Sequence, residues 1–245
     1  MGGAARVWAV LAGVALVTFA AVAHGDAPAW REDFHVTPPG WELRTKPNTK
    51  VTQFRVDPAG AAGNGVLIME AEDASATFAV QLKGVDLKRT PTLRWRWRVL
   101  ALPTDADGRV SERDDQAIGI YVSHGGILGQ RSVAYRWETK TPVGSEGTAT
   151  YAAGVVKVHW LALRNEQDGL DTWYTEERNV AADFQRAFGF IPDDPIIAVT
   201  CNSQYTSSRA VAELDWIELT GETELRRAPG TPVDTAAPET PEETP

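Results

Sequence analysis

Apolar and polar residues alternate along much of the chain, and the clearest case is residues 92–100. Two sets of side chains interleave there: Leu93, Trp95, Trp97 and Val99 in one set, and Arg94, Arg96 and Arg98 in the other. Successive side chains on a β-strand point to opposite faces of the sheet. The segment is therefore predicted to be a strand that turns an apolar face to the core and a cationic face outward.

Shorter stretches of the same kind recur along the chain, separated by turn-forming residues such as Pro38-Pro39-Gly40. The predicted strands are residues 51–56, 66–71, 77–82, 117–123, 132–138, 155–163, 196–201 and 211–219, and a further strand can start at Trp41-Glu42-Leu43. Nine tryptophans can build a core from such short strands. The tryptophans assigned to this core are Trp95, Trp97, Trp137, Trp160 and Trp216.

One segment has a helical pattern instead. Val180, Phe184 and Phe188 recur at a spacing of four, which is typical of a buried helical stripe. Asn179 is a suitable N-cap, and Gly189 is a suitable C-terminal stop. The sequence thus predicts one helix over residues 180–188.

Many short strands and one helix favour an all-β class, a jelly-roll-like antiparallel β-sandwich with one short helix. No internal repeat and no second core-forming segment is visible in the sequence. We therefore expect a single domain over residues 28–223.

The two ends of the chain have a different composition. Residues 1–23 contain Arg6, a long apolar run and the small-residue ending Ala21-Val22-Ala23, which predicts a signal peptide. A retained membrane anchor is the alternative, because the run approaches the length that spans a bilayer. Residues 224–245 are rich in Pro, Thr and Glu and are predicted to be disordered. The mature protein is expected to be periplasmic or secreted, with no membrane span.

Composition narrows the function classes. A net charge of −9 and a pI near 5.0 argue against a nucleic-acid partner, which favours a basic surface. Cys201 is the only cysteine, so an intramolecular disulfide is excluded, and we expect it to be a small buried side chain. The chain lacks a zinc-ligand spacing, a phosphate-binding loop and a nucleophile elbow. No cofactor and no metal are expected.

Several motifs resemble those of one bacterial family. In chain order they are Trp95-Arg96-Trp97-Arg98-Val99, Leu102-Pro103, Asp114-Asp115-Gln116-Ala117, Ala134-Tyr135-Arg136-Trp137-Glu138 and Arg178-Asn179-Val180. Their order and spacing resemble the exported bacterial family catalogued as domain of unknown function 3047. The resemblance covers about residues 34–219. It implies export, while the family's own name assigns no activity.

The chain also departs from this family's pattern at two places. Ile118-Gly119 stands where an arginine is expected, and Asn202 and Gln204 stand where the family pattern is acidic. A charged site in relatives would therefore be altered here. Separately, residues 214–219 resemble the last strand of jelly-roll carbohydrate-binding modules, a likeness of fold that transfers no function.

The arginines of residues 92–100 are the first candidates for ligand binding, because a guanidinium suits carboxylates, sulfates and phosphates. The alternative is that they pair with acids on neighbouring strands. Tyr121 is a candidate for stacking on a sugar ring. Asp115 and Glu138 are candidate acids, although the sequence alone cannot place two carboxylates about a sugar at the separation that a glycosidase needs.

The candidate ligand-binding residues are Arg94, Arg96, Asp115, Tyr121, Arg136, Asn202 and Gln204. We expect the arginines and Tyr121 to share one sheet face. The leading hypothesis is a non-catalytic module that binds a glycan or another envelope ligand. The alternatives are a polysaccharide-acting enzyme, a hydrolase or lyase using a carboxylate on the sheet face, and a structural or partner-binding envelope protein.

Overall fold

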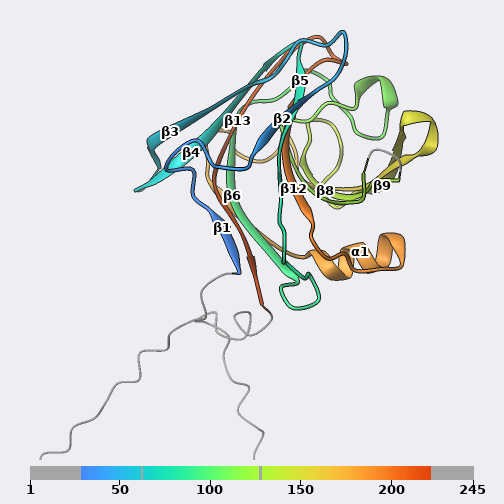
Figure 1. Ribbon diagram of the computed structural model, residues 1–245. Coiled ribbons are helices and arrows are strands. Elements are labelled where there is room, and N and C mark those ends of the chain that lie inside the picture. The colour runs from blue at the N-terminus through green and yellow to red at the C-terminus, as the bar shows by residue number, and fades with distance from the viewer. Residues whose placement is uncertain (1–28, 62, 127–128, 222–245) are drawn as a thin grey trace, which may run out of the picture.

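The computed structural model describes residues 29–61, 63–126 and 129–221, so the predicted signal peptide and C-terminal tail lie outside the described residues. The described chain forms two stacked β-sheets with a helix at one end (Figure 1). The first sheet, sheet A, contains β1 (Trp30–Glu32), β3 (Gln53–Ala61), β4 (Asn64–Glu72), β6 (Thr92–Ala101), β11 (Tyr174–Asn179) and β13 (Arg209–Thr220). The second, sheet B, contains β2 (Glu42–Thr45), β5 (Ser75–Gln81), β7 (Ile118–His124), β8 (Arg131–Trp137), β9 (Glu146–Tyr151), β10 (Val156–Arg164) and β12 (Ile196–Asn202).

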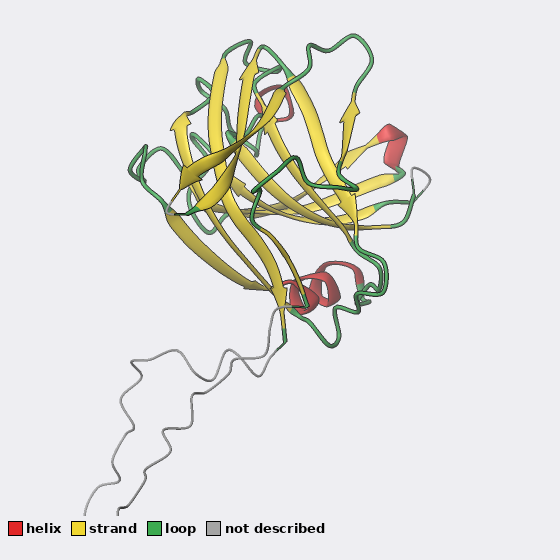
Figure 2. Cartoon of the chain, turned by 60° about the vertical axis from the view of Figure 1, so that its left-hand side comes forward, coloured by secondary structure: helices red, strands yellow, loops and turns green. Residues whose placement is uncertain are grey.

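The order of strands is β11-β6-β13-β4-β3 in sheet A, with β1 also paired to β13, and β2-β5-β12-β7-β8-β10-β9 in sheet B. This arrangement confirms the predicted β-sandwich (Figure 2). One detail differs from the expectation of an antiparallel fold, because β10 pairs with β8 in parallel. Between these two strands the chain crosses through β9, which is not among the strands predicted from the sequence.

Aromatic side chains from the two sheets meet in the core. Trp95 of β6 stacks on Tyr135 of β8 with ring centroids 5.2 Å apart, and Trp97 packs on Trp137 at 5.8 Å. All four side chains are fully buried. The apolar face predicted for residues 92–100 is therefore the centre of the sandwich.

Two other tryptophans lie outside this inter-sheet cluster: Trp160 is buried as predicted, whereas Trp216 is only partly buried, which corrects the prediction for that residue. Trp160 is buried, but it packs with Ala134 and Val158 on the outer face of sheet B. Trp216 lies on the outer face of sheet A beneath Arg31. Its position follows from a bulge between Leu214 and Trp216, which moves the later residues of β13 to the other face.

Helix α1 (Val180–Phe188) has the predicted bounds and caps. The Asn179 side chain accepts a hydrogen bond from the Ala182 backbone N–H, and Gly189 adopts a left-handed conformation with φ of 80°. Tyr135 donates a hydrogen bond of 2.7 Å to Asp183, which ties the helix to the sandwich core. The short turns η1 (Ser111–Arg113) and η2 (Ala152–Gly154) complete the structure. Within the described residues, no helix has the length and apolar character needed to cross a membrane.

Candidate functional site

The predicted candidates do not share one sheet face. Arg94 and Arg96 lie on β6 in sheet A, whereas Tyr121 on β7 and Arg136 on β8 lie in sheet B. The expectation of a single face is wrong, because alternation within a strand shows which residues share a side but not which sheet the strand joins. The two groups project from opposite outer surfaces of the sandwich.

On sheet A, the arginines of β6 are paired with acids from neighbouring strands. Arg96 donates to Asp215 at 2.6 Å, and Arg98 lies 2.7 Å from both Glu213 and Asp171. Arg94 follows the same pattern, with Glu218 at 2.9 Å and Glu177 at 3.2 Å. The alternative of pairing within the sheet is thus the one observed.

Tryptophans complete this ladder on sheet A. The guanidinium groups of Arg96 and Arg98 lie 5.0 and 4.6 Å from the ring centroid of Trp173, and Arg31 lies 4.7 Å from that of Trp216. Cations at these distances are attracted to the ring face. Both the arginines and the aromatic faces of sheet A therefore already have partners.

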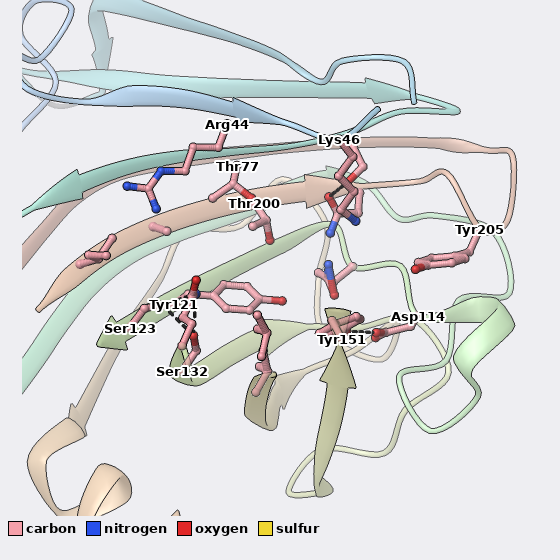
Figure 3. Close-up of a pocket in the computed structure, with 18 residues that line it drawn as sticks. Arg44, Lys46, Thr77, Asp114, Tyr121, Ser123, Ser132, Tyr151, Thr200 and Tyr205 are labelled. Atoms are coloured by element: carbon pink, nitrogen blue, oxygen red, sulfur yellow. Dashed lines mark hydrogen bonds between the residues drawn. The ribbon is translucent and has the colours of Figure 1, made fainter. Parts of the chain in front are cut away.

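The outer face of sheet B carries a groove instead, with a volume of about 320 Å³. Eighteen residues line this groove (Figure 3): Arg44, Lys46, Ser75, Thr77, Asp114, Gln116, Tyr121, Ser123, Gln130, Ser132, Tyr151, Val156, Val158, Ile196, Ala198, Thr200, Asn202 and Tyr205. Hydroxyl, amide and small apolar side chains predominate among them. A second hollow adjoins it and shares Arg44, Gln130 and Ile196.

The register of sheet B explains the hollow. Arg44, Thr77, Thr200, Gly119 and Arg136 are successive cross-strand partners on β2, β5, β12, β7 and β8. The large side chains stand at the two ends of this row, and the three between them are small. Adjacent strands are about 4.8 Å apart, so the floor between the two arginines is several strands wide.

Gly119 lets the ring of Tyr121 lie along this floor. A Cβ atom at position 119 would come within 2.7 Å of Tyr121 Cε2 and 3.0 Å of Thr200 Oγ1. The Tyr121 hydroxyl is directed toward Tyr151 and Asp114 at one end of the groove (Figure 3). Any larger residue at position 119 would displace the ring or fill the floor.

A buried charge cluster lies beneath the tyrosines. Arg136 is fully buried, and its Nη1 lies 2.7 Å from Asp114 and 3.5 Å from Glu138. Tyr151 donates a hydrogen bond of 2.5 Å to the other oxygen of Asp114. The ring centroid of Tyr121 is 5.8 Å from the Arg136 guanidinium. This cluster fixes the wall of the groove from below.

The cluster sets the protonation of the groups around it. Burial raises the pKa of Glu138 above its usual value, and burial also raises that of Asp115. Burial raises the pKa of the Tyr121 hydroxyl, and burial together with the nearby Tyr121 and Asp114 raises that of Tyr151. Neither tyrosine is therefore prepared to act as a base near neutral pH.

Two acceptor atoms of the groove have no partner among the described residues. They are Gln116 Oε1 and Thr200 Oγ1, and their side chains are only 1% and 6% exposed. A buried polar atom without a hydrogen bond is costly, and both oxygens are themselves enclosed, so a donor from a ligand reaches them only after a small rotation of the side chain. The floor thus has unused capacity to accept hydrogen bonds.

The other predicted site residues have distinct positions. Asn202 lines the groove and accepts a hydrogen bond from Ser75 at 2.8 Å. Asp115 is fully buried, and it accepts bonds of 2.8 and 2.9 Å from the backbone and hydroxyl of Thr206. It therefore holds the loop after β12. Gln204 lies in that loop, outside the groove lining.

Sequence reasoning did not identify one wall of the groove. Arg44 and Lys46 come from β2 and the turn after it, and Tyr151 ends β9, which is not among the predicted strands. A usable signal was present for the floor. Hydroxyl residues alternate with apolar ones at Ser75 and Thr77, which is typical of an exposed polar stripe.

Comparison with protein families gives one result. The profile described as "Protein of unknown function (DUF3047)" matches residues 39–218, which is most of the chain. The chain belongs to this family. The DUF3047 match confirms the resemblance seen in the sequence motifs. No curated protein is significantly similar to the chain.

Several solved structures have a related arrangement of strands. A family 11 carbohydrate-binding module from Clostridium thermocellum, in complex with a mixed-linked tetrasaccharide, is 14% identical with a TM-score of 0.41, over 78% of this chain and 93% of its own. A thermostable cellulase derived from Cel12A of Rhodothermus marinus is 13% identical with a TM-score of 0.44, over 74% and 92%. Likenesses this weak carry no argument about the function of the DUF3047 chain.

Proposed function

We propose that this protein is an exported, non-catalytic module whose groove on sheet B binds a glycan. The observation that carries the proposal is the pair of unpartnered acceptors, Gln116 Oε1 and Thr200 Oγ1, on the floor of an open groove. Sugar hydroxyl groups are donors that could satisfy both. The ring of Tyr121 beside them offers a flat apolar face with a polar end, which suits a sugar ring.

The shape of the groove supports a chain ligand. Its floor follows β12 from Asn202 to Ile196, and a strand of this length extends about 20 Å. At the far end, Ser123 and Ser132 bond to each other at 2.8 Å, with the Gln130 amide 3.1 Å from Ser132. Hydroxyl and amide groups are thus spaced along the whole length. Several consecutive sugar units could be held by the same kind of contact.

The carboxylates of the groove favour binding over catalysis. Asp114 is the one acid among the eighteen lining residues, and Arg136 and Tyr151 already hold its two oxygens. Asp115 and Glu138 are fully buried. A glycosidase needs two carboxyl groups on either side of the scissile bond, one of them free to donate a proton. The described residues of the groove offer no such pair.

Binding to a panel of polysaccharides, with groove and surface variants compared, tests this proposal. Thr200→Val removes the unpartnered acceptor without changing the side-chain shape, and it should weaken binding about two- to tenfold, the usual range for one neutral hydrogen bond. Tyr121→Ala should weaken binding further. Thr175→Val, on the exposed outer face of sheet A, is the matched control and should leave affinity unchanged.

Two results would count against glycan binding. One is a wild-type protein that binds no member of the panel. The other is binding that Tyr121→Ala and Thr200→Val leave intact, because the ligand would then lie elsewhere. Release of shortened oligosaccharides during the incubation would instead favour the polysaccharide-acting enzyme.

A further inference from the structure

We infer that the glycan bound in the groove is acidic, carrying carboxylate or sulfate groups that Arg44 and Lys46 recognise. This inference deepens the proposed function and rests on it. Both cations line the groove and both are exposed. They stand two residues apart at the end of β2, and both reach the groove from the same wall (Figure 3).

Neither cation forms the ion pairs that the arginines of sheet A form. Within the part of the chain that the structure describes, Arg44 has no hydrogen bond and no ion pair. Lys46 also lacks both; partial burial of its ammonium group lowers its pKa, and the nearby charges of Asp114 and Asp115 offset part of this shift. By contrast, Arg94, Arg96 and Arg98 each contact at least one carboxylate at 2.9 Å or less. A guanidinium without a partner keeps its full capacity to bind an anion.

The acids near this wall do not neutralise it on the solvent side. Asp114 is 8% exposed and paired with Arg136, while Asp115 is fully buried and bonded to Thr206. Asp193 and Asp194 are exposed, but they line the adjoining hollow, outside the lining of the main groove, and neither forms an ion pair with Arg44. A ligand entering the main groove therefore meets exposed cations first. This occurs in a chain whose net charge is −9.

The strand register places Arg44, in the cationic wall formed with Lys46, near Thr200 on the floor of the groove. Arg44 is the cross-strand partner of Thr77, which is the partner of Thr200. Two strand spacings of about 4.8 Å separate Arg44 from Thr200, so a ligand unit lying across β5 would have to bridge the two side chains. One ligand unit could then donate hydroxyl groups to Thr200 while presenting an anion to Arg44. An acidic sugar has both groups on one ring.

Matched polysaccharides test this inference. Polygalacturonate and its fully methyl-esterified form share one backbone and differ in the methyl ester that removes the charge of each unit. A sulfated polysaccharide and a neutral glucan complete the set. We expect the wild-type protein to bind polygalacturonate or the sulfated polysaccharide about tenfold more tightly than the uncharged chains, in line with a charged hydrogen bond. The two acidic ligands distinguish a carboxylate from a sulfate. Added salt should weaken the acidic interaction selectively.

The decisive variant is R44Q/K46Q. It should bring the affinity for the acidic chain down to that for the ester, and its urea unfolding should match that of the wild-type protein. K88Q/R89Q is the control, since it makes the same change of charge at exposed residues outside the groove. It should leave the preference for acid intact.

The outcomes separate the two proposals. If acidic and uncharged chains bind equally well, or if R44Q/K46Q keeps the preference for acid, the acidic ligand is refuted while glycan binding stands. If no polysaccharide of either kind binds, both glycan binding and the acidic ligand are refuted. Urea unfolding of R44Q/K46Q that matches the wild-type protein shows that a lost preference for acid does not come from a loss of folding.

Discussion

The outer faces of the two sheets both carry arginines, but the partners of these arginines differ between the two sheets. On sheet A, Arg94, Arg96 and Arg98 are spaced along one strand, and acids and tryptophans of the same sheet surround them. On sheet B, Arg136 is buried with its acids, and Arg44 stands at the rim with no partner among the described residues. Arginine content alone therefore does not identify a binding face. What matters is whether the fold already supplies the anion.

The largest loss of folding stability is expected when Arg136 is replaced. Replacing it with methionine leaves Asp114 and Glu138 buried without their cation, and breaking a buried ion pair in this way costs about 3 to 5 kcal/mol. The free energy of unfolding, measured with urea at pH 7, should fall by that amount. Lys157→Met, at an exposed position of β10, is the control and should change it by less than about 0.5 kcal/mol.

The loss at Arg136 should also depend on pH. Burial already raises the pKa of Glu138, so the folded variant retains its proton at a pH where the unfolded chain has released it. Stability then falls as the pH rises through this window and recovers as the pH is lowered. A deficit that stays constant between pH 7 and pH 4 would show that lost packing, and not charge burial, is responsible.

The difference between Arg136 and the arginines of sheet A also indicates what the sequence could predict. Alternation over residues 92–100 predicts the buried Trp95 and Trp97 correctly, and the caps Asn179 and Gly189 predict the helix, because these signals are local. The sheet to which a strand belongs depends on partners far along the chain. Nothing near Arg136 in the sequence shows that β8 and β6 lie in different sheets.

Edge strands and bulges were also difficult to predict from the sequence. The sequence predicts that a strand can start at Trp41-Glu42-Leu43, but all four residues of β2 are exposed, so no apolar face shows which way Arg44 points, and Arg44 was not among the predicted site residues. The bulge between Leu214 and Trp216 shifts the face of every residue after it, which strict alternation cannot anticipate. The candidate site was therefore predicted only in part. Tyr121 and Asn202 line the groove, whereas Arg94 and Arg96 lie on the opposite side of the molecule.

An intermediate effect is expected at Arg96. Its side chain is 30% exposed, and it bonds to the buried Asp215 and lies over Trp173. Arg96→Met should lower the free energy of unfolding by about 1 to 2 kcal/mol, less than at Arg136 because water reaches the arginine. Affinity for every glycan should stay at the wild-type value. A loss of binding without a loss of stability would mean that the ligand binds to sheet A and that the groove on sheet B is not the binding site.

The smallest effect is expected at Arg44. Its guanidinium has no hydrogen bond or ion pair within the described chain, so Arg44→Gln removes no stabilising contact and should change the free energy of unfolding by less than about 0.5 kcal/mol. Urea unfolding of this variant beside Arg96→Met measures the contrast directly. A loss of 1 kcal/mol or more would mean that the fold uses Arg44 as it uses Arg96, and the cationic wall would then be structural. With no such loss, the charge of Arg44 is available to a ligand without cost to the fold.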